Sequence, residues 1–190
     1  MKKVFGIAAI ALAVVSLTGC SLIPTKNNSG SVNTPVEKPA KGNCNVFDCI
    51  KKIDINDNLE KVNKVMGFEG EKTTETSSYS TYKWVINADK DEEVEVTFYS
   101  TSANIKISFK DDAIKNSKVD FSKFDEIKKA MNNRETVTYD DVKAKFGADG
   151  VLVEKSSFSN KYRWVNAKGG YMNGNFSLSS GACTMIMGRI

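Results

Sequence analysis

The sequence contains no histidine among its 190 residues. Histidine is the side chain that most often serves as a general base near neutral pH, and it is also the commonest metal ligand in proteins. The carboxylate pairs that remain fall in predicted turns or at a predicted helix start, where solvation and capping account for them. The sequence therefore predicts a protein that is not an enzyme and that holds no metal ion and no cofactor.

A strong charge of one sign is also missing. The formal net charge of the chain is +4, and it falls to +2 once Lys2 and Lys3 are left out. A balance this close to neutral does not indicate a nucleic-acid partner or a polybasic membrane-binding surface. We therefore expect no nucleic acid among the partners of the protein.

Only one apolar run is long, and it lies at the start of the chain. Residues 4–15 follow two lysines and are too few for a stable membrane span, which is typical of a signal peptide. The run leads into Leu17-Thr18-Gly19-Cys20, which resembles the bacterial lipoprotein signal, where a small residue precedes an invariant cysteine. The resemblance implies a signal peptide over 1–19 and a diacylglycerol on Cys20, which anchors the protein in the cell membrane on its extracytoplasmic face. The alternative is a secreted protein with a cysteine there by chance.

Prolines are few, and all three lie between residues 20 and 43. The rest of this stretch is mostly serine, asparagine, glycine, lysine and threonine, with few large apolar side chains to bury. The composition predicts that residues 20–43 hold the lipidated cysteine and a flexible tether with an r.m.s. span of about 25 Å. An ordered N-terminal arm is the alternative.

Cysteines are scarce and leave an odd number to pair. Of the four, Cys20 is assigned to the lipid, which leaves Cys44, Cys49 and Cys183. An oxidising location favours disulfides. Cys44 and Cys49 are close enough in sequence to close a small loop, so they are the favoured candidate disulfide. A pair that includes Cys183 and a set of free thiols are the alternatives, and a zinc site would need a fourth soft ligand.

One stretch of the chain occurs twice. Tyr82-Lys83-Trp84-Val85 and Tyr162-Arg163-Trp164-Val165 lie 80 positions apart and hold the only two tryptophans. The similarity extends outward, since Gly67 precedes Gly147 by 80 positions and Phe98 precedes Phe176 by 78. A near-constant offset is the signature of an internal repeat. The sequence therefore predicts two tandem repeats, over 44–112 and 118–190.

Within each repeat, the hydrophobic spacing predicts two short helices followed by four strands. In the second repeat, residues 121–132 have helical spacing, and Thr138 with Asp141 forms a capping box before a helix that ends at Gly147. The strands are predicted over 70–76, 80–87, 93–100, 104–109, 151–156, 160–167, 171–178 and 182–188. The fold class is thus α+β, with each repeat made of two short helices packed on a four-stranded antiparallel sheet.

Alternation along the strands assigns side chains to the two faces of the sheet. It leaves open whether Tyr82 and Trp84 point into the core or out to solvent. With the tryptophans inside, the candidate partner-binding surface on the open face is Lys83, Glu95, Tyr99, Arg163 and Tyr171. Near the end of the chain, the side chains predicted to point inward include those of Leu178, Met185 and Met187.

The order of elements has a known counterpart. A helix, a capped helix with a valine and a glycine stop, and a strand carrying Tyr-x-Trp resemble the repeat of the β-lactamase inhibitory protein family. The pattern is also similar to the small-protein-A type of outer-membrane assembly lipoprotein. The residues that carry the resemblance are Thr138, Tyr139, Val142, Gly147, Tyr162, Trp164 and Phe176, and Asn58, Leu59, Val62, Gly67, Tyr82, Trp84 and Phe98.

The resemblance implies a binder or a scaffold, because members of this superfamily are not enzymes. The inhibitors grip their enzyme with the sheet and insert an acidic hairpin loop, and the matching loop here is residues 87–92, with Asp89 and Asp91. The leading hypothesis is a lipid-anchored, extracytoplasmic protein-binding module without catalytic activity, whose partner is an unidentified extracytoplasmic protein. The alternatives are an inhibitor of a β-lactamase or a cell-wall enzyme, and a scaffold for envelope assembly.

Overall fold

A computed structural model describes residues 42–190 of the chain. The predicted signal peptide (1–19), Cys20 and most of the predicted tether lie outside these residues. Contacts gather the described residues into one compact unit. Its fold is α+β, as the sequence predicts, with four α-helices and a nine-stranded sheet in the described part.

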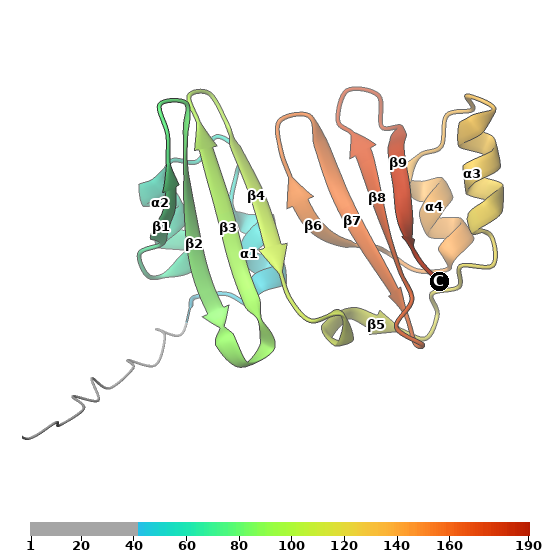
Figure 1. Cartoon of the computed structure of the whole chain (residues 1–190), viewed down its shortest axis with the longest axis horizontal. Helices are drawn as coiled ribbons and strands as arrows, with labels where there is room; N and C mark the ends of the chain where they lie inside the picture. The colour runs from blue at the N-terminus through green and yellow to red at the C-terminus, as the bar shows by residue number, and fades with distance from the viewer. Residues whose placement is uncertain (1–41) are drawn as a thin grey trace, which may run out of the picture. The chain divides into compact units, whose positions relative to one another are not determined.

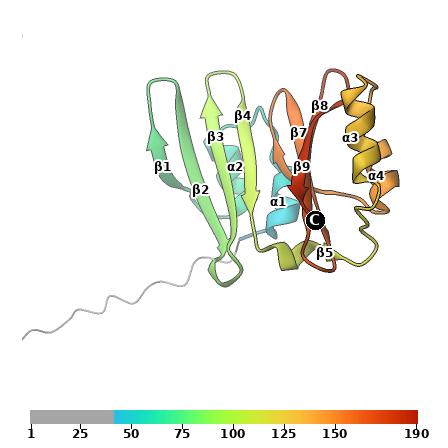
Figure 2. The same ribbon diagram turned by 45° about the vertical axis from the view of Figure 1, so that its right-hand side comes forward.

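The sheet runs in the order β1-β2-β3-β4-β6-β7-β8-β9, and neighbours along this path are antiparallel. The short strand β5 adds a parallel pairing with β7. Figure 1 shows the sheet with α1 and α2 behind its first four strands, and α3 and α4 lie to the right of β9 in this view and in the turned view of Figure 2. Buried side chains of α3 and α4 join those of β7 and β8 in one core cluster. The helices are α1 (Val46–Lys52), α2 (Leu59–Met66), α3 (Phe124–Asn132) and α4 (Tyr139–Phe146). The strands are β1 (Glu71–Glu75), β2 (Tyr79–Asn87), β3 (Glu92–Tyr99), β4 (Ala103–Ser108), β5 (Lys115–Asn116), β6 (Val151–Lys155), β7 (Ser159–Asn166), β8 (Tyr171–Ser177) and β9 (Cys183–Arg189).

Helices α2 and α4 each begin after a capping side chain and end at a glycine. Asn58 caps α2, and Thr138 caps α4 with a full capping box through Asp141. Each helix then ends at a glycine in the left-handed region, Gly67 at φ 85° and Gly147 at φ 77°, where a side chain would be strained. Helix α3 begins at Phe124 and not at residue 121, because Phe121 lies in a preceding turn and packs edge-on against Phe146.

The cap of α4 gives a first testable prediction. We expect Thr138→Ala to lower the free energy of unfolding by about 1 kcal/mol, since the hydroxyl accepts from the backbone N–H of Asp141. The exposed Thr136→Ala is the matched control, and the urea midpoint is the measurement. Hydrogen bonds from the backbone and hydroxyl of Thr138 lower the pKa of Asp141. This carboxylate therefore contributes stability above its ordinary pKa and loses it as the pH falls through the lowered value, so the wild type loses part of its advantage in acid. Equal losses for the two variants at neutral pH would contradict the prediction.

The core forms two clusters on the helix side of the sheet. Trp84 (fully buried) lies in the first with α1 and α2, and Trp164 (1% exposed) lies in the second with α4. The Nε1–H of Trp84 donates to Asn63 Oδ1 at 3.1 Å and to the Phe68 carbonyl oxygen at 3.2 Å, while that of Trp164 donates to the Ala148 carbonyl oxygen at 2.9 Å. Both indoles are thus buried with their polar atom paired. Of the two orientations that the sequence left open, the structure contains the inward one.

The two halves of the sheet meet at β4 and β6. Only two residue pairs join these strands, Ile105 with Lys155 and Lys106 with Glu154. Helix α1 packs across this seam against β3, β4 and β6, and Val153 of β6 belongs to the first core cluster. The seam is therefore held more by the helix and the shared core beneath it than by its short ladder.

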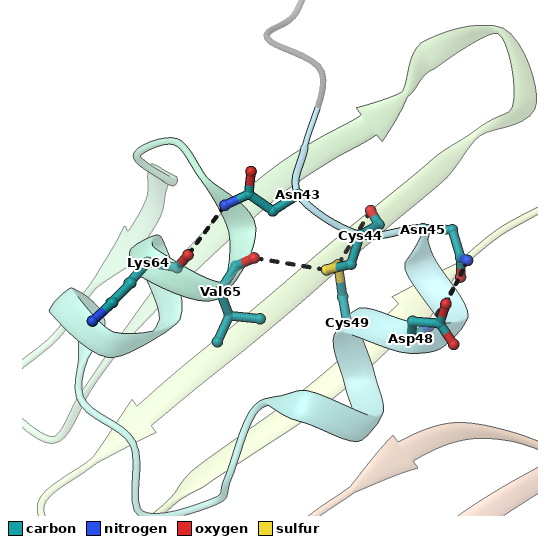
Figure 3. The surroundings of a disulfide bond; sticks show 7 residues. All are labelled: Asn43, Cys44, Asn45, Asp48, Cys49, Lys64 and Val65. Atoms are coloured by element: carbon teal, nitrogen blue, oxygen red, sulfur yellow. Dashed lines mark hydrogen bonds between the residues drawn. A yellow bond between two sulfur atoms is a disulfide. The ribbon is translucent and has the colours of Figure 1, made fainter.

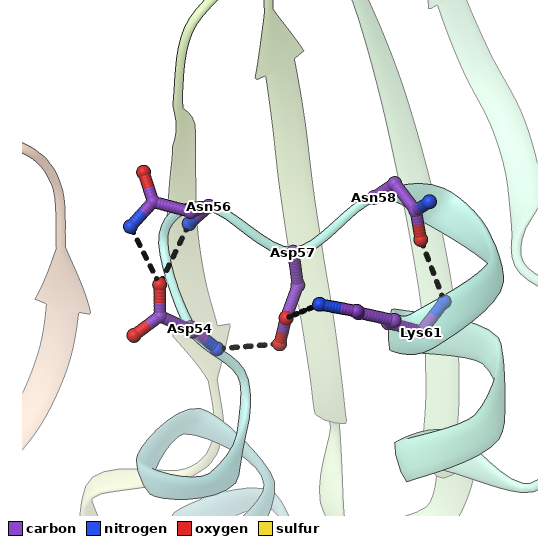
Figure 4. A network of polar contacts seen from close by, with 5 residues as sticks. All are labelled: Asp54, Asn56, Asp57, Asn58 and Lys61. Atoms are coloured by element: carbon purple, nitrogen blue, oxygen red, sulfur yellow. Dashed lines mark hydrogen bonds and ion pairs between the residues drawn. The ribbon is translucent and has the colours of Figure 1, made fainter.

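The loop between α1 and α2 is rich in carboxylate and amide groups that fix its shape (Figure 4). Asp54 Oδ1 accepts from the backbone and side-chain N–H groups of Asn56 at 2.8 and 2.9 Å, and Asp57 Oδ2 accepts from the backbone of Asp54 at 2.8 Å. The backbone hydrogen bond from Asn56 is the main cause that lowers the pKa of Asp54. These oxygens serve as acceptors in a turn, which holds the carbonyl of Ile55 where the N–H of Ala103 reaches it at 2.7 Å.

A disulfide joins Cys44 to Cys49 at the start of α1 (Figure 3), while Cys183 is free and buried. The pair that the spacing favours is therefore the one that the structure contains. Just before it, the backbone N–H of Asn43 donates to the Met66 carbonyl oxygen at 2.9 Å. The disulfide therefore fixes the residues that precede α1 to the first turn of α1, next to the end of α2.

Three side chains near the end of the chain point the other way from the prediction. Leu178 is 52% exposed because it lies in the turn after β8, where its N–H donates to the Phe158 carbonyl oxygen. Met185 and Met187 are 42% and 55% exposed. A bulge places Phe176 opposite Cys183 and Asn175 opposite Met185, so one extra residue in β9 reverses the alternation. Ile186, and not either methionine, packs against the core.

Candidate functional site

The face of the sheet that carries no helix is crossed by a row of alternating charges. Residues directly opposite one another on paired strands lie on the same face, so the pairing can be followed from strand to strand. Lys83 pairs with Glu95, Glu95 with Lys106, and Lys106 with Glu154 across the seam. From β1 to β9 the row is Glu71, Lys83, Glu95, Lys106, Glu154, Lys161, Asn175 and Met185. The open face thus presents six charges of alternating sign followed by a neutral end.

Within this row, Glu154 has the densest set of polar contacts. Its carboxylate accepts from Lys161 Nζ and, at 3.2 Å, from the Asn104 side-chain amide. Burial by itself would raise the pKa of Glu154, but the hydrogen bonds from Lys161 and Asn104 outweigh it and hold the pKa below its ordinary value. The carboxylate is therefore ionised at neutral pH, and its charge is already shared with a neighbouring lysine.

Beside the row, the open face is hollowed at the seam. The hollow has a volume of about 370 Å³. Its wall contains Lys106, Lys161 and Arg163 from the open face, and also Ile107 and Val153 from the first core. Core side chains reach it because β4 and β6 pair at only two positions. The hollow therefore presents apolar groups beside charged ones.

Arg163 forms the second polar centre of this face. Its guanidinium lies 3.2 Å from Asp111, and its Cζ lies 4.5 Å from the centre of the Tyr171 ring. The Nε atom of Arg163 is buried and has no hydrogen-bond partner. Asp111 belongs to the short 3-10 helix Asp111–Ile114, which leads into β5. The connection between the halves thus supplies the acid that orients this arginine.

The five residues predicted as a partner surface fall into three separate groups. Lys83 and Glu95 are direct neighbours in the charged row, and Arg163 stacks on Tyr171. Tyr99 lies at the far end of β3, half exposed and 5.8 Å from Tyr79 between ring centres. Sequence reasoning did not select Lys106, Glu154 or Lys161, which link the first two groups. Alternation places them on strands, but only the strand order shows that they stand side by side.

The loop that corresponds to the acidic hairpin is fixed to the connection between the halves. Asp89 and Asp91 lie in or next to the 3-10 helix Ala88–Lys90. Lys110 Nζ donates to the Asp89 carbonyl oxygen at 2.7 Å and lies 3.5 Å from the Asp91 carboxylate. Asp91 takes a left-handed backbone conformation with φ 53°. Lysine thus holds the loop, and the Asp91 carboxylate remains 67% exposed.

Over the described range 42–190, no cluster of three or more acidic, cysteine or histidine side chains is placed to hold a metal ion. Over the same range, no helix combines the length and hydropathy that a membrane span requires. Comparisons with family models, curated proteins and solved structures find no match to this chain.

Proposed function

We propose that this chain is a lipid-anchored, extracytoplasmic protein-binding module without catalytic activity, and that it binds its partner with the open face of the sheet. The observation that carries the proposal is the row of alternating charges beside the hollow at the seam. A surface for a polyanion such as nucleic acid would carry one sign of charge. A row of both signs instead fits a protein surface with complementary charges, where such patterns set orientation and specificity.

We further propose that the sheet is built from two copies of one unit. In support, Gly70 lies against the ring of Trp84 and Gly150 against that of Trp164, so an added Cβ would come within 2.4 and 2.6 Å of the indoles. The pairing of β1 with β2 shifts register between Lys72 and Thr74, and that of β6 with β7 shifts between Leu152 and Glu154, 80 positions later. Duplication would give one wide face to a fold whose single copy has a small core. The predicted kinship with the β-lactamase inhibitory protein family belongs to this proposal.

The anchor is the third part of the proposal. It depends on the predicted diacylglycerol on Cys20, which lies outside the described residues. We expect the protein to fractionate with the membrane, and the variant Cys20→Ala to lose the lipid mass and leave the membrane fraction. A Cys20→Ala protein that stays in the membrane fraction would contradict a lipid anchor at this position. The binding proposal would survive that result, because it rests on residues of the sheet.

Binding by the open face is tested with the compact segment 37–190, which contains both core clusters. We expect the segment to capture a specific protein from extracts of the cell envelope. We also expect Lys106→Glu to weaken that capture by about tenfold or more, since it reverses the exposed charge at the centre of the row. The measurement is the affinity of the captured protein for each variant, with circular dichroism to check the fold.

The matched control is Lys64→Glu, because Lys64 is exposed on α2 and belongs to the helix side. Its affinity should equal that of the wild type. If both reversals weaken capture equally, the partner does not use the open face. Turnover of a wall substrate by the segment, without a specific partner, would overturn the proposal as a whole.

Inhibition of an extracytoplasmic enzyme is the second candidate function, and one observation favours it. The loop with Asp89 and Asp91 is held by Lys110, so an exposed carboxylate is presented from a fixed position. We expect an inhibitor of this kind to lose potency when Asp91 is replaced by asparagine. Assays of β-lactamases and cell-wall hydrolases with the segment and with Asp91→Asn test this candidate. Unchanged enzyme rates with the segment at submillimolar concentration would reject the inhibitor function. The proposal of a binding module would not be affected by that result.

A further inference from the structure

We propose that β9 is a self-pairing edge: two copies of the chain join their β9 strands antiparallel and form a symmetric dimer with one continuous sheet. This inference does not depend on the identity of the partner bound by the open face. It follows from how the chain itself adds a strand to the edge of β4, and from the composition of the two edges of the sheet.

The seam between β4 and β6 shows what the edge of β4 accepts. At the start of β4, the N–H of Ala103 points away from the sheet and donates to the Ile55 carbonyl oxygen in the loop before α2, at 2.7 Å. Beyond that contact, the edge pairs with β6 at Ile105 and Lys106. Helix α1 lies across the junction, and Val46, Cys49 and Ile50 of this helix are fully buried. The outer edge of β4 is thus covered by a loop contact at its start and by β6 beyond it, and α1 packs over the junction.

The edge of β9 has the same loop contact but no added strand. The N–H of Cys183 donates to the Val137 carbonyl oxygen in the loop before α4, at 2.6 Å. Beyond it, β9 pairs only with β8 within residues 42–190. The corresponding helix, α3, has one fully buried residue, Ile127, while Phe124 and Met131 are only partly buried. The backbone N–H and C=O groups on the outer side of β9 are thus available to another strand.

The side chains of β9 are unusual for a free edge. Natural edges are commonly protected by charges, prolines or bulges that prevent pairing with another chain. Between Cys183 and Arg189, β9 has no charged side chain, and Met185 and Met187 project from the open face at 42% and 55% exposure. The bulge that turns both methionines outward lies at the start of the strand and leaves the rest regular. This edge is therefore apolar, and it is accessible along most of its length.

The other edge of the sheet is a poor match for β9 in a head-to-tail assembly. Strand β1 reads Glu-Lys-Thr-Thr-Glu, all five residues are exposed, and Lys72 pairs with Glu75 on its surface. Its counterpart at the seam, β6, instead supplies Val151, Leu152 and Val153 to the first core cluster. Pairing β9 with β1 of another copy would set the methionines against threonine and glutamate. Pairing β9 with itself sets methionine against methionine.

Symmetry and the accessible length of β9 together set the register of the pair. The two-fold axis of an antiparallel pair stands perpendicular to the sheet, so each residue faces one from the same face of the partner copy. The loop contact at Cys183 leaves residues 184–188 free to pair, and overlap of these five residues with those of a second copy places the axis at Ile186. Met185 then lies opposite Met187 of the other copy, and Met187 opposite Met185. The helices of both copies stay on one side, and the two open faces join into one surface.

The test uses the segment 37–190 and two double variants. In Met185→Lys/Met187→Lys, every new ammonium group faces another across the axis, so we expect the dimer to weaken by about tenfold or more. In Met185→Lys/Met187→Glu, every ammonium group faces a carboxylate, so we expect the dimer to persist. Both variants change the same exposed positions, which controls for effects on the monomer. Analytical ultracentrifugation from micromolar to submillimolar protein is the measurement.

A wild-type dimer that the lysine pair dissociates and the lysine–glutamate pair retains supports the proposal. A wild type that is monomeric at submillimolar concentration overturns it. Equal dissociation of both variants overturns the register centred on Ile186, and an unaffected dimer in both shows that the contact lies elsewhere. Lys106→Glu should dimerise like the wild type, so failure of the dimer and failure of the proposed binding function can be told apart.

Discussion

Replacing Trp84 by alanine is expected to lower the free energy of unfolding by about 3–5 kcal/mol. The indole is fully buried in the first core cluster, and its Nε1–H donates to both Asn63 and the Phe68 carbonyl. Alanine would leave a cavity beneath Gly70, which has no side chain to fill it, and would remove the donor that these two acceptors share. Urea unfolding followed by far-UV circular dichroism measures the loss without relying on tryptophan fluorescence.

Tyr99→Ala is the matched control for this prediction. Tyr99 is also an aromatic residue of the first four strands, but it is half exposed and on the other face, beside Tyr79. Its loss should cost well under half as much as the loss of Trp84. If the two variants had similar midpoints, the assignment of Trp84 to the core and of Tyr99 to the open face would be wrong. The same comparison thus tests which face of the sheet is packed against the core.

The strands were predictable because two kinds of signal agree in this chain. Alternation along β3, with Val94, Val96 and Phe98 on one face, identifies a strand by itself. The recurrence of Tyr-x-Trp then matches β7 to β2, and the 78-residue offset between Phe98 and Phe176 transfers the assignment of β3 to β8, whose alternation is weaker. Each of the eight predicted strands lies within one residue of its observed bounds.

The sequence-based predictions fail where one extra residue reverses the alternation of a strand. They also fail where strands far apart in the sequence pair with each other. The bulge before Met185 is set by how Cys183 meets both Phe176 and the loop at Val137, and no local pattern reports this. The seam between β4 and β6 was likewise not predictable, since edges or helices could have joined the halves equally well. The charged residues of the row are all visible in the sequence, but only the order of the strands shows that they lie side by side on the open face. The candidate site therefore follows from topology more than from motif.

The second large effect is expected from removal of the disulfide. We expect Cys44→Ala/Cys49→Ala to lower the free energy of unfolding by about 2–3 kcal/mol. Part of the loss is the entropy of a chain that is no longer closed into a small loop. The rest arises because Cys49 is fully buried and alanine leaves part of its volume empty. The bond sits where α1 begins, and α1 covers the seam, so the loosened end is the one that holds the two halves together.

Reduction of the wild type provides the control, because it breaks the bond without removing any sulfur. A reductant should lower the urea midpoint of the wild type and leave that of the double alanine variant unchanged. Thiol titration of the unfolded segment should give a single free group before reduction, from Cys183, which is buried in the fold. Three free thiols in unreduced protein would contradict the bond. An unchanged midpoint after full reduction would show that the α1 end is held by Asn43, Asn45 and the core alone, and that the seam does not depend on the sulfur bridge.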